Sequence, residues 1–222
     1  MPPTSHSTER TEQAAYTADA PNYDQRTRAY QLWRRQIVDL LPLQPGDVVI
    51  DAGCGTGLCF PMVQDRIGPS GRILAVDMAP DMLSLAAQRA ADHGWRNVTL
   101  QLAPAEEVSF PITADHALFC AVHDVMQSDA ALRNVLSQVR PGGHVVAGGG
   151  KWAAPWAVGL NLMAANTHSP FVRDFAGFDK PWAVLARHVV DLRVLDVAMG
   201  CGFLAVGRMP GGQDAVRPRV SD

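Results

Sequence analysis

Three glycines at alternating positions follow an apolar run and an aspartate in the segment 48–58, VVIDAGCGTGL. The glycines are Gly53, Gly55 and Gly57, and the aspartate before them is Asp51. Glycine costs conformational entropy, so this spacing indicates a backbone that takes conformations unfavourable for other residues or that a ligand approaches closely. In open α/β sheets, ligands bind at the carboxyl ends of strands, where this loop is expected to lie.

A second carboxylate, Asp77, ends the next apolar run in ILAVDMAPDML. It follows the glycines by about twenty residues, the spacing of a carboxylate that binds ribose hydroxyls. The glycines are spaced GxGxG, whereas dinucleotide-binding loops have GxGxxG. Because Asp51 stands beside the loop, a pyrophosphate there would be repelled, whereas an ammonium or a sulfonium would be attracted. The pattern favours a ribonucleoside that carries a cationic group, and S-adenosylmethionine fits that description.

Short apolar segments alternate with longer amphipathic ones along the chain. This alternation predicts an α/β fold with a parallel sheet covered on both faces. We expect strands at 47–53, 71–77, 97–103, 115–122 and 140–150, and an antiparallel hairpin around Gly200. We expect helices at 30–41, 58–67, 80–93, 129–139, 154–166 and 181–189.

The 222 residues correspond to a single domain by length. We expect this domain at 21–209, with an N-terminal helical arm at 21–42 that closes over the ligand or packs on the surface. The polar ends, 1–20 and 210–222, are predicted to be flexible tails.

Composition excludes several function classes. The net charge is −3 and no basic run occurs, which argues against a nucleic-acid partner. The four cysteines lack metal-ligand spacing, so we expect reduced thiols, no metal and a cytoplasmic protein. The apolar stretch 145–165 is interrupted by Lys151, Pro155 and Asn161, and we expect no integral membrane segment. A homodimer stays open.

Five motifs occur in a familiar order: VVIDAGCGTGL, ILAVDMAPDML, LAPAEEVSF, ALFCAVHDVM and VRPGGHVVAGGG. Over roughly residues 47–150 the chain resembles the class I S-adenosylmethionine-dependent methyltransferases. It is most similar to the small-molecule branch that includes quinone-biosynthesis C-methyltransferases and phospholipid N-methyltransferases. The resemblance implies a Rossmann-like, doubly wound sheet of seven mostly parallel strands, with the seventh antiparallel between the fifth and sixth.

The resemblance also assigns the methionine part of the cofactor to specific residues. Gly53, Cys54 and Gly55 would contact it through their backbone. Asp51 would orient its amino group, and the carbonyl of Cys120 would face the same ammonium.

The nucleoside contacts that the resemblance implies come from three further residues: Asp77 on both ribose hydroxyls, Met78 on the adenine face, and Ala105, whose N–H meets the adenine ring. One position departs from the family. Pro104 stands where relatives often have an aspartate that accepts from the adenine amine. Either Glu106 or Glu107 replaces it, or water or backbone binds the amine.

His123 follows the fourth predicted strand, where the family has the floor of its active site. It is our candidate catalytic base, and a purely structural histidine is the alternative. Asp124 beside it either caps the next helix or orients the imidazole. In the family, the insert at about 151–182 walls the acceptor pocket, and core packing explains its aromatic residues equally well. Those residues are Trp152, Trp156, Phe171, Phe175, Phe178 and Trp182.

The sequence therefore predicts methyl transfer from S-adenosylmethionine to a small, partly apolar or aromatic acceptor by in-line displacement. Two alternatives remain. One is a protein on this scaffold that does not methylate, either a cofactor sensor or an enzyme that uses the sulfonium as a fixed charge. The other is a nicotinamide-dependent dehydrogenase, which the glycine spacing and Asp51 disfavour.

Overall fold

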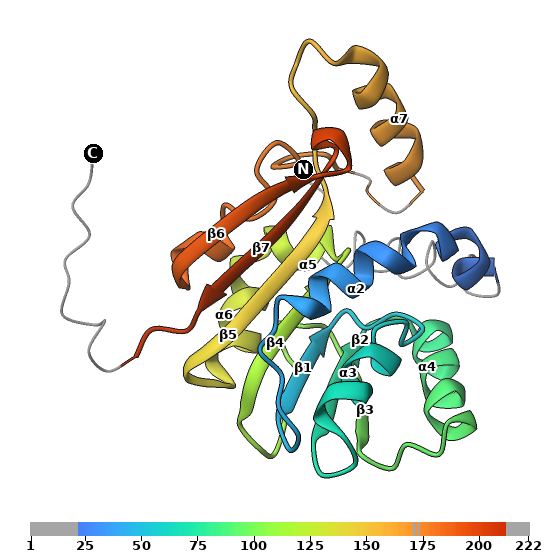
Figure 1. The fold of residues 1–222 in the computed structure, drawn as a ribbon, viewed down its shortest axis with the longest axis vertical. Helices are drawn as coiled ribbons and strands as arrows, with labels where there is room; N and C mark the ends of the chain where they lie inside the picture. The colour runs from blue at the N-terminus through green and yellow to red at the C-terminus, as the bar shows by residue number, and fades with distance from the viewer. Residues whose placement is uncertain (1–21, 171, 173, 212–222) are drawn as a thin grey trace, which may run out of the picture.

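A computed structural model describes residues 22–170, 172 and 174–211 as one sheet with helices on both faces (Figure 1). The predicted tails, apart from 210 and 211, lie outside these residues, and so does Phe171. The sheet has seven strands. They are β1 (Val48–Ala52), β2 (Arg72–Asp77), β3 (Val98–Leu102), β4 (Ala114–Cys120), β5 (Val139–Gly150), β6 (Val190–Val197) and β7 (Gly202–Arg208).

The strand order is β3-β2-β1-β4-β5-β7-β6. β1 to β5 pair in parallel, whereas β7 is antiparallel to both β5 and β6. The predicted sheet and its closing hairpin are thus confirmed. The chain runs outward from β1 in one direction, then returns to place β4 on the other side of β1. This reversal marks the carboxyl ends of β1 and β4 as the place where a ligand binds.

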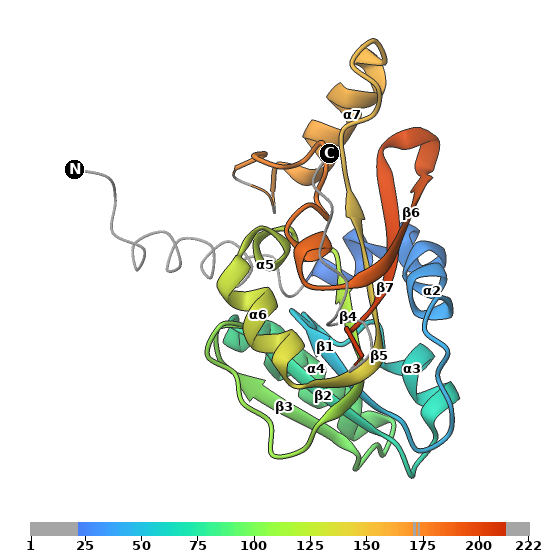
Figure 2. The ribbon, with the colours of Figure 1, turned by 90° about the vertical axis from the view of Figure 1, so that its left-hand side faces the viewer.

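Helices cover the two faces of the sheet separately (Figures 1 and 2). One face packs against α2 (Gln31–Asp39), α3 (Phe60–Ile67) and α4 (Pro80–Asp92). The other packs against α5 (His123–Gln127), α6 (Asp129–Ser137) and the short turn η2 (Leu185–Arg187). The remaining elements are η1 (Arg28–Tyr30), α7 (Val158–His168) and η3 (Ala198–Gly200). No helix of the described residues is long and apolar enough to cross a membrane.

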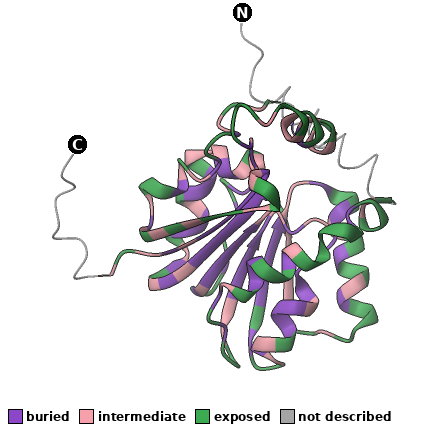
Figure 3. Ribbon diagram, turned by 45° about the horizontal axis from the view of Figure 1, so that its top comes forward, coloured by how far each residue is buried: buried purple, intermediate pink, exposed green. Residues whose placement is uncertain are grey.

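The core lies on both faces of the central strands, which are buried along their length (Figure 3). Successive side chains of a strand point to opposite faces, so Val49 joins the cluster with α2 and α3 while Ile50 joins the cluster with α6. Leu118 and Phe119 divide in the same way on β4. The short apolar runs of the sequence therefore become strands that are buried on both sides.

The helix predicted at 181–189 is wrong. The structure has a series of turns there, ending in η2, with hydrogen bonds such as Arg187 N–H to the Val184 carbonyl. The segment is too short to hold a helix by itself. Burial of Leu185 and Val189 against the sheet fixes the turns instead. The structure also adds α5, which the sequence did not predict, and starts α7 four residues later than expected.

The glycine run at the end of β5 makes room for neighbouring elements. A Cβ on Gly148 would lie 2.6 Å from Cδ1 of Ile37, so glycine lets α2 pack directly on this strand. Because α2 carries residues that line the ligand site, this contact couples the sheet to the site.

We predict that Gly148→Ala lowers the free energy of unfolding by about 1–3 kcal/mol, the usual cost of overpacking a core. Gly159→Ala in α7 is the matched control, because a Cβ there meets nothing within 4 Å. Urea denaturation of both variants measures the effect. Equal stability of the two variants would contradict the packing of α2 described here.

Candidate active site

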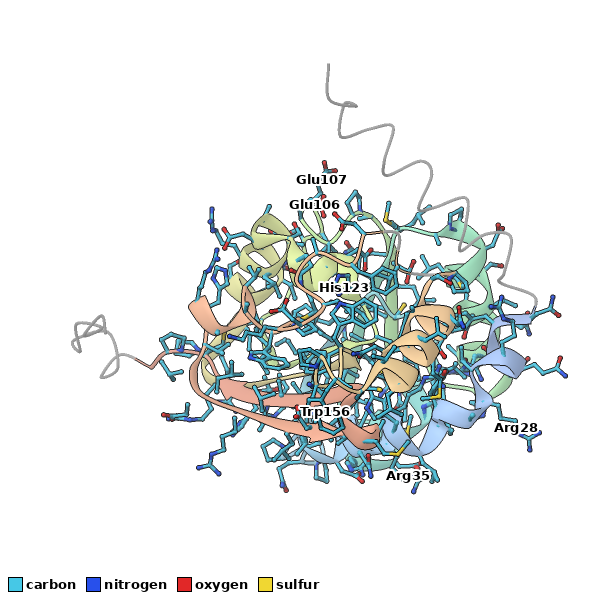
Figure 4. The ribbon with its side chains drawn as sticks, turned by 90° about the horizontal axis from the view of Figure 1, so that it is seen from above. Arg28, Arg35, Glu106, Glu107, His123 and Trp156 are labelled. Carbon is cyan, nitrogen blue, oxygen red and sulfur yellow. The ribbon has the colours of Figure 1, made fainter. Side chains whose placement is uncertain are left out.

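A cavity of about 640 Å³ opens at the carboxyl ends of the parallel strands. Figure 4 looks down on this end of the sheet, with His123 near the centre of the view. All ten site residues predicted from the sequence line this cavity. They are Asp51, Gly53, Cys54, Gly55, Asp77, Met78, Ala105, Glu106, Cys120 and His123.

The glycine loop that follows β1 needs its glycines for two different reasons. Gly53, Gly55 and Gly57 all have a left-handed backbone, with φ of 69°, 54° and 76°. A Cβ on Gly53 would also lie 2.4 Å from Cγ1 of Val122, so the loop after β4 could not pack there. At Gly55 a Cβ would meet nothing within 4 Å, which leaves this backbone open to the cavity.

The backbone donors of this loop already have partners inside the protein. The N–H groups of Gly53 and Cys54 both donate to the carbonyl of Val76, at 2.9 and 3.0 Å. The N–H of Gly55 donates to Oδ2 of Asp77 at 2.7 Å. Backbone contacts from this loop to a ligand therefore fall to carbonyl oxygens, which suit a cationic donor such as an ammonium.

Asp77 joins the two motifs that the sequence singled out. Besides Gly55, it accepts a hydrogen bond from the N–H of Ala79 at Oδ1, at 2.9 Å. Burial raises the pKa of Asp77, and the backbone donors oppose that rise. A carboxylate offers about four acceptor positions, so Asp77 keeps room for a ligand's hydroxyl group beside its backbone donors Gly55, Ala79 and Met78.

Asp51 is the most deeply buried carboxylate of the site, with 2% of its surface exposed. Among the described residues its Oδ2 has no hydrogen-bond partner. Burial, followed by the charge of Asp77, raises the pKa of Asp51 to about 7. A buried carboxyl oxygen without a partner is costly, and a donor supplied by a ligand would remove that cost.

Asp124 is a third carboxylate in the same cavity, a place the sequence did not assign to it. It faces the open space of the cavity, yet protein surrounds it on its other sides, and this burial raises its pKa. With Asp51 and Asp77, it makes the cavity favour a cation over an anion such as a pyrophosphate.

Arg34 and Tyr23 line the cavity from the N-terminal side, and sequence reasoning missed the arginine. Arg34 has 5% of its surface exposed, and its Nη1 donates to the carbonyl of Thr27 at 2.9 Å. Burial raises the pKa of Tyr23 to about 12. Arg34 stands three and four residues before Ile37 and Val38, on the buried face of α2. The sequence did contain a signal for this residue, because Arg34 is a charged side chain on the otherwise apolar face of the helix.

The N-terminal arm is attached to the glycine loop by polar contacts. Thr56 donates from Oγ1 to Asp24 at 2.6 Å, and Arg89 forms an ion pair with the same aspartate. Arg89 also donates from Nε to the carbonyl of Thr56 at 2.8 Å. These contacts hold residues 22–26 of the arm beside the cavity.

Met78, Ala105 and Glu106, which the sequence resemblance assigns to adenine, all line the cavity. Of the two glutamates considered for the adenine amine, Glu106 lines the cavity, whereas Glu107 is exposed and outside its lining. Figure 4 shows the two side by side at the edge of the molecule. Glu106 is thus the better placed of the two acceptors.

His123 stands at the start of α5, just after a strained turn. Ala121 before it has φ of 60°, a conformation that costs energy in alanine and recurs at functional sites. Nε2 of His123 lies 3.2 Å from the carbonyl oxygen of Ala176. Because a carbonyl only accepts, Nε2 carries the proton and Nδ1 is the bare nitrogen. Within the described part of the chain, Nδ1 is buried without a partner. Burial also lowers the pKa of His123, so its neutral form dominates at pH 7.

A second, narrower cavity of about 80 Å³ adjoins the first, and His123, Ala121 and Val122 line both. Of the described aromatic residues of the insert, Phe178 alone lines it. Trp152 and Phe175 pack on Phe178 with centroid separations of 4.9 and 5.0 Å. The others point elsewhere: Trp182 packs on Phe203, and Trp156 is 84% exposed (Figure 4).

Comparison with known proteins gives the chain its relatives. A family model described as a methyltransferase domain matches residues 43–154, half of the chain. The chain is 26% identical over 154 residues to the demethylmenaquinone methyltransferase of Symbiobacterium thermophilum, covering 66% of this chain and 61% of the relative. It is 30% identical over 123 residues to the ubiquinone/menaquinone biosynthesis C-methyltransferase UbiE of Hahella chejuensis, covering 53% and 48%. The chain thus spans about half to three fifths of these curated relatives' length.

Among solved structures, the fold matches the N-methyltransferase NodS from Bradyrhizobium japonicum WM9 in complex with S-adenosyl-L-homocysteine. The TM-score is 0.58 at 18% identity, and the match covers 91% of this chain and 98% of NodS. At this identity the likeness shows a shared fold. The family match carries the assignment further, because it includes the glycine loop, both aspartates and the end of β4. This chain belongs to the class I S-adenosylmethionine-dependent methyltransferase family.

Proposed function

We propose that this protein transfers a methyl group from S-adenosylmethionine to a small, partly apolar or aromatic acceptor. The observation that carries the proposal is the buried Asp51 oxygen without a partner, in a cavity that Asp77 and Asp124 also line. Such a cavity suits a ligand with cationic groups and ribose hydroxyls, and the adjoining aromatic cavity suits an apolar acceptor.

The residues present fit the cofactor. Asp51 would accept from its ammonium, together with carbonyls of the glycine loop and of Cys120, and Arg34 would bind its carboxylate. Asp77 would hold the ribose hydroxyls, while Met78, Ala105 and Glu106 would surround the adenine. When bound, the cofactor supplies a methyl group that is already activated by its sulfonium charge.

The protein's contribution to the reaction is then approach, orientation and proton removal. Neutral His123 is our candidate base, because its Nδ1 is free to accept a proton when the acceptor is a hydroxyl or an acidic carbon. An amine acceptor in its neutral form would need no base. Asp124 lies beside His123 in sequence and in the cavity, and stabilises the imidazolium that forms.

The two alternative functions, a dehydrogenase and a cofactor sensor, can be told apart from a methyltransferase. A nicotinamide dinucleotide would place its pyrophosphate among acidic side chains, which disfavours a dehydrogenase. A sensor on the same scaffold would bind the cofactor and release no product. An acceptor screen that measures S-adenosylhomocysteine formation with phenols, quinols and amines separates these functions, and formation with none of them would favour the sensor.

We further propose that the partner is a small molecule and that nucleic acid is not one. The net charge of −3 supports this, and so does an acidic rather than basic cavity. We also propose a cytoplasmic location, and we leave a homodimer open as an alternative to a monomer. Size-exclusion chromatography with light scattering measures the oligomeric state.

Asp77→Ala should weaken S-adenosylmethionine binding by about 1.5–3 kcal/mol, the range for hydrogen bonds to a charged group. Glu107→Gln is the control, because it removes an exposed carboxylate outside the cavity lining. Titration calorimetry measures the affinity, and thermal unfolding verifies that Asp77→Ala is folded. Unchanged affinity in a folded variant would rule out the ribose assignment.

Cofactor affinity should rise with pH up to about 7 and fall again above about 8, where the ligand's α-ammonium loses its own proton. Asp51, with its pKa raised to about 7, is protonated below that pH and must lose its proton to accept from an ammonium. The other titratable groups that line the cavity include Asp77, Glu106, Asp124, Asp174 and His123. Asp51→Asn should bind more weakly and flatten the profile.

The same substitution has a readout without ligand. A carboxyl whose pKa is raised in the folded state stabilises the protein less as pH rises from its unfolded value of 3.8 to about 7. Asp51→Asn should therefore be more stable than the parent above pH 7, as measured by urea denaturation. If the free energy of unfolding changed with pH in the same way in both proteins, the raised pKa of Asp51 would be contradicted.

His123→Gln should lower turnover by about 10²–10⁴ if the acceptor is a hydroxyl or an acidic carbon, the usual contribution of a general base. Its affinity for S-adenosylmethionine should stay close to that of the parent. Initial rates of S-adenosylhomocysteine formation and calorimetry measure the two quantities. Full turnover with such an acceptor would return His123 to a structural role.

A further inference from the structure

We propose that the second cavity is the acceptor site and that it takes a planar aromatic compound with a hydroxyl group and a second oxygen. Trp33, His123 and His168 would make the polar contacts. The proposal rests on the methyl-transfer function above and names the class of acceptor.

Buried polar atoms without partners point to this ligand. The described residues contain three such side-chain atoms: Asp51 Oδ2, Trp33 Nε1 and His123 Nδ1. Asp51 lines the first cavity, Trp33 lines the second, and His123 lines both. Native proteins leave few buried polar groups unpaired, because each costs free energy. A ligand that supplies the missing partners explains both.

The two atoms differ in chemistry, and this sets the pattern that a ligand must match. The indole Nε1–H of Trp33 only donates, so it needs an acceptor oxygen. Nδ1 of His123 is the bare nitrogen of its ring, so it needs a donor such as a hydroxyl. A compound with one hydroxyl and one further oxygen satisfies both.

His168 adds a third polar group, and a glycine at the end of β5 leaves space for its ring. A Cβ on Gly150, the last residue of β5, would lie 2.2 Å from Nε2 of His168. Glycine at this position therefore lets the imidazole lie against the strand and line the cavity. We assign His168 as a donor to the hydroxyl oxygen.

Phe178 gives the cavity its preference for a flat ring. Its side chain is 1% exposed and contacts both imidazoles edge to face, with centroids 5.2 Å from His123 and 5.4 Å from His168. Tyr30 and Phe203 line the same cavity. A planar acceptor would lie among these rings, with its hydroxyl proton passing to His123 Nδ1 and the electron pair staying on oxygen.

Three matched probes test this assignment by fluorescence titration of the full chain. The first is para-hydroxyacetophenone, which carries a hydroxyl and a carbonyl oxygen. The second is para-methoxyacetophenone, which lacks the hydroxyl proton, and the third is para-ethylphenol, which lacks the carbonyl oxygen. The titrations are done with and without S-adenosylhomocysteine.

The parent protein should bind para-hydroxyacetophenone about tenfold more tightly than either of the other two probes. A tenfold difference is the effect of about one hydrogen bond. Trp33→Phe keeps an aromatic ring and should abolish the preference over para-ethylphenol alone. Gly150→Ala displaces His168 and should weaken binding of both hydroxylated probes. Gly159→Ala, whose Cβ meets nothing within 4 Å, should leave all three affinities unchanged.

Two outcomes would overturn the inference: equal affinities for the three probes in the parent, or a preference that Trp33→Phe leaves intact. These outcomes are distinct from failure of the proposed function. If the protein binds S-adenosylhomocysteine but shows no probe preference, the acceptor assignment fails and the cofactor assignment stands. If it binds the probes with the expected pattern but no S-adenosylhomocysteine, the cofactor assignment fails.

Discussion

A buried carboxyl group without an internal partner is the constraint on which this site depends. Asp51 lies one residue before the end of β1, a strand that is buried on both faces, so little solvent reaches its charge. Burial raises the pKa of Asp51 to about 7, so below that pH a proton replaces the uncompensated charge. The same arrangement favours a ligand that brings a positive group to Asp51. Selectivity for a cation thus follows from where the strand ends.

Glycines let the segments that form the site approach one another closely. Gly53 lets the loop after β4 approach the loop after β1, and Gly148 lets α2 approach β5. Gly150 makes room for His168 in the same way. Each contact brings a segment distant in sequence to the carboxyl ends of the strands. Asp77 then joins the first two strands through its hydrogen bond with Gly55. The cavity therefore forms because glycines let these backbone segments pack closely together, and it does not depend on long loops.

The sequence predicts most of the sheet because apolar runs and glycine turns are local signals. The spacing of the glycine loop and Asp77 indicates the site, and the family resemblance supplies its other predicted residues, all of which line one cavity. The sequence-based prediction fails at 181–189, where burial of Leu185 overrides helical periodicity. It misses Arg34 and the meeting of Trp33 and His123 in one cavity, because these depend on how α2 crosses the sheet. Long-range packing of that kind leaves no pattern within a single segment.

Proton release on cofactor binding tests the central claim most directly. Titration calorimetry with S-adenosylhomocysteine at pH 6.5, in buffers of different protonation enthalpy, counts the protons exchanged. A carboxyl with a pKa of about 7 is mostly protonated there and must ionise to bind an ammonium. The account predicts release of roughly half a proton or more per cofactor bound, abolished in Asp51→Asn. Binding without proton release in the parent would contradict it.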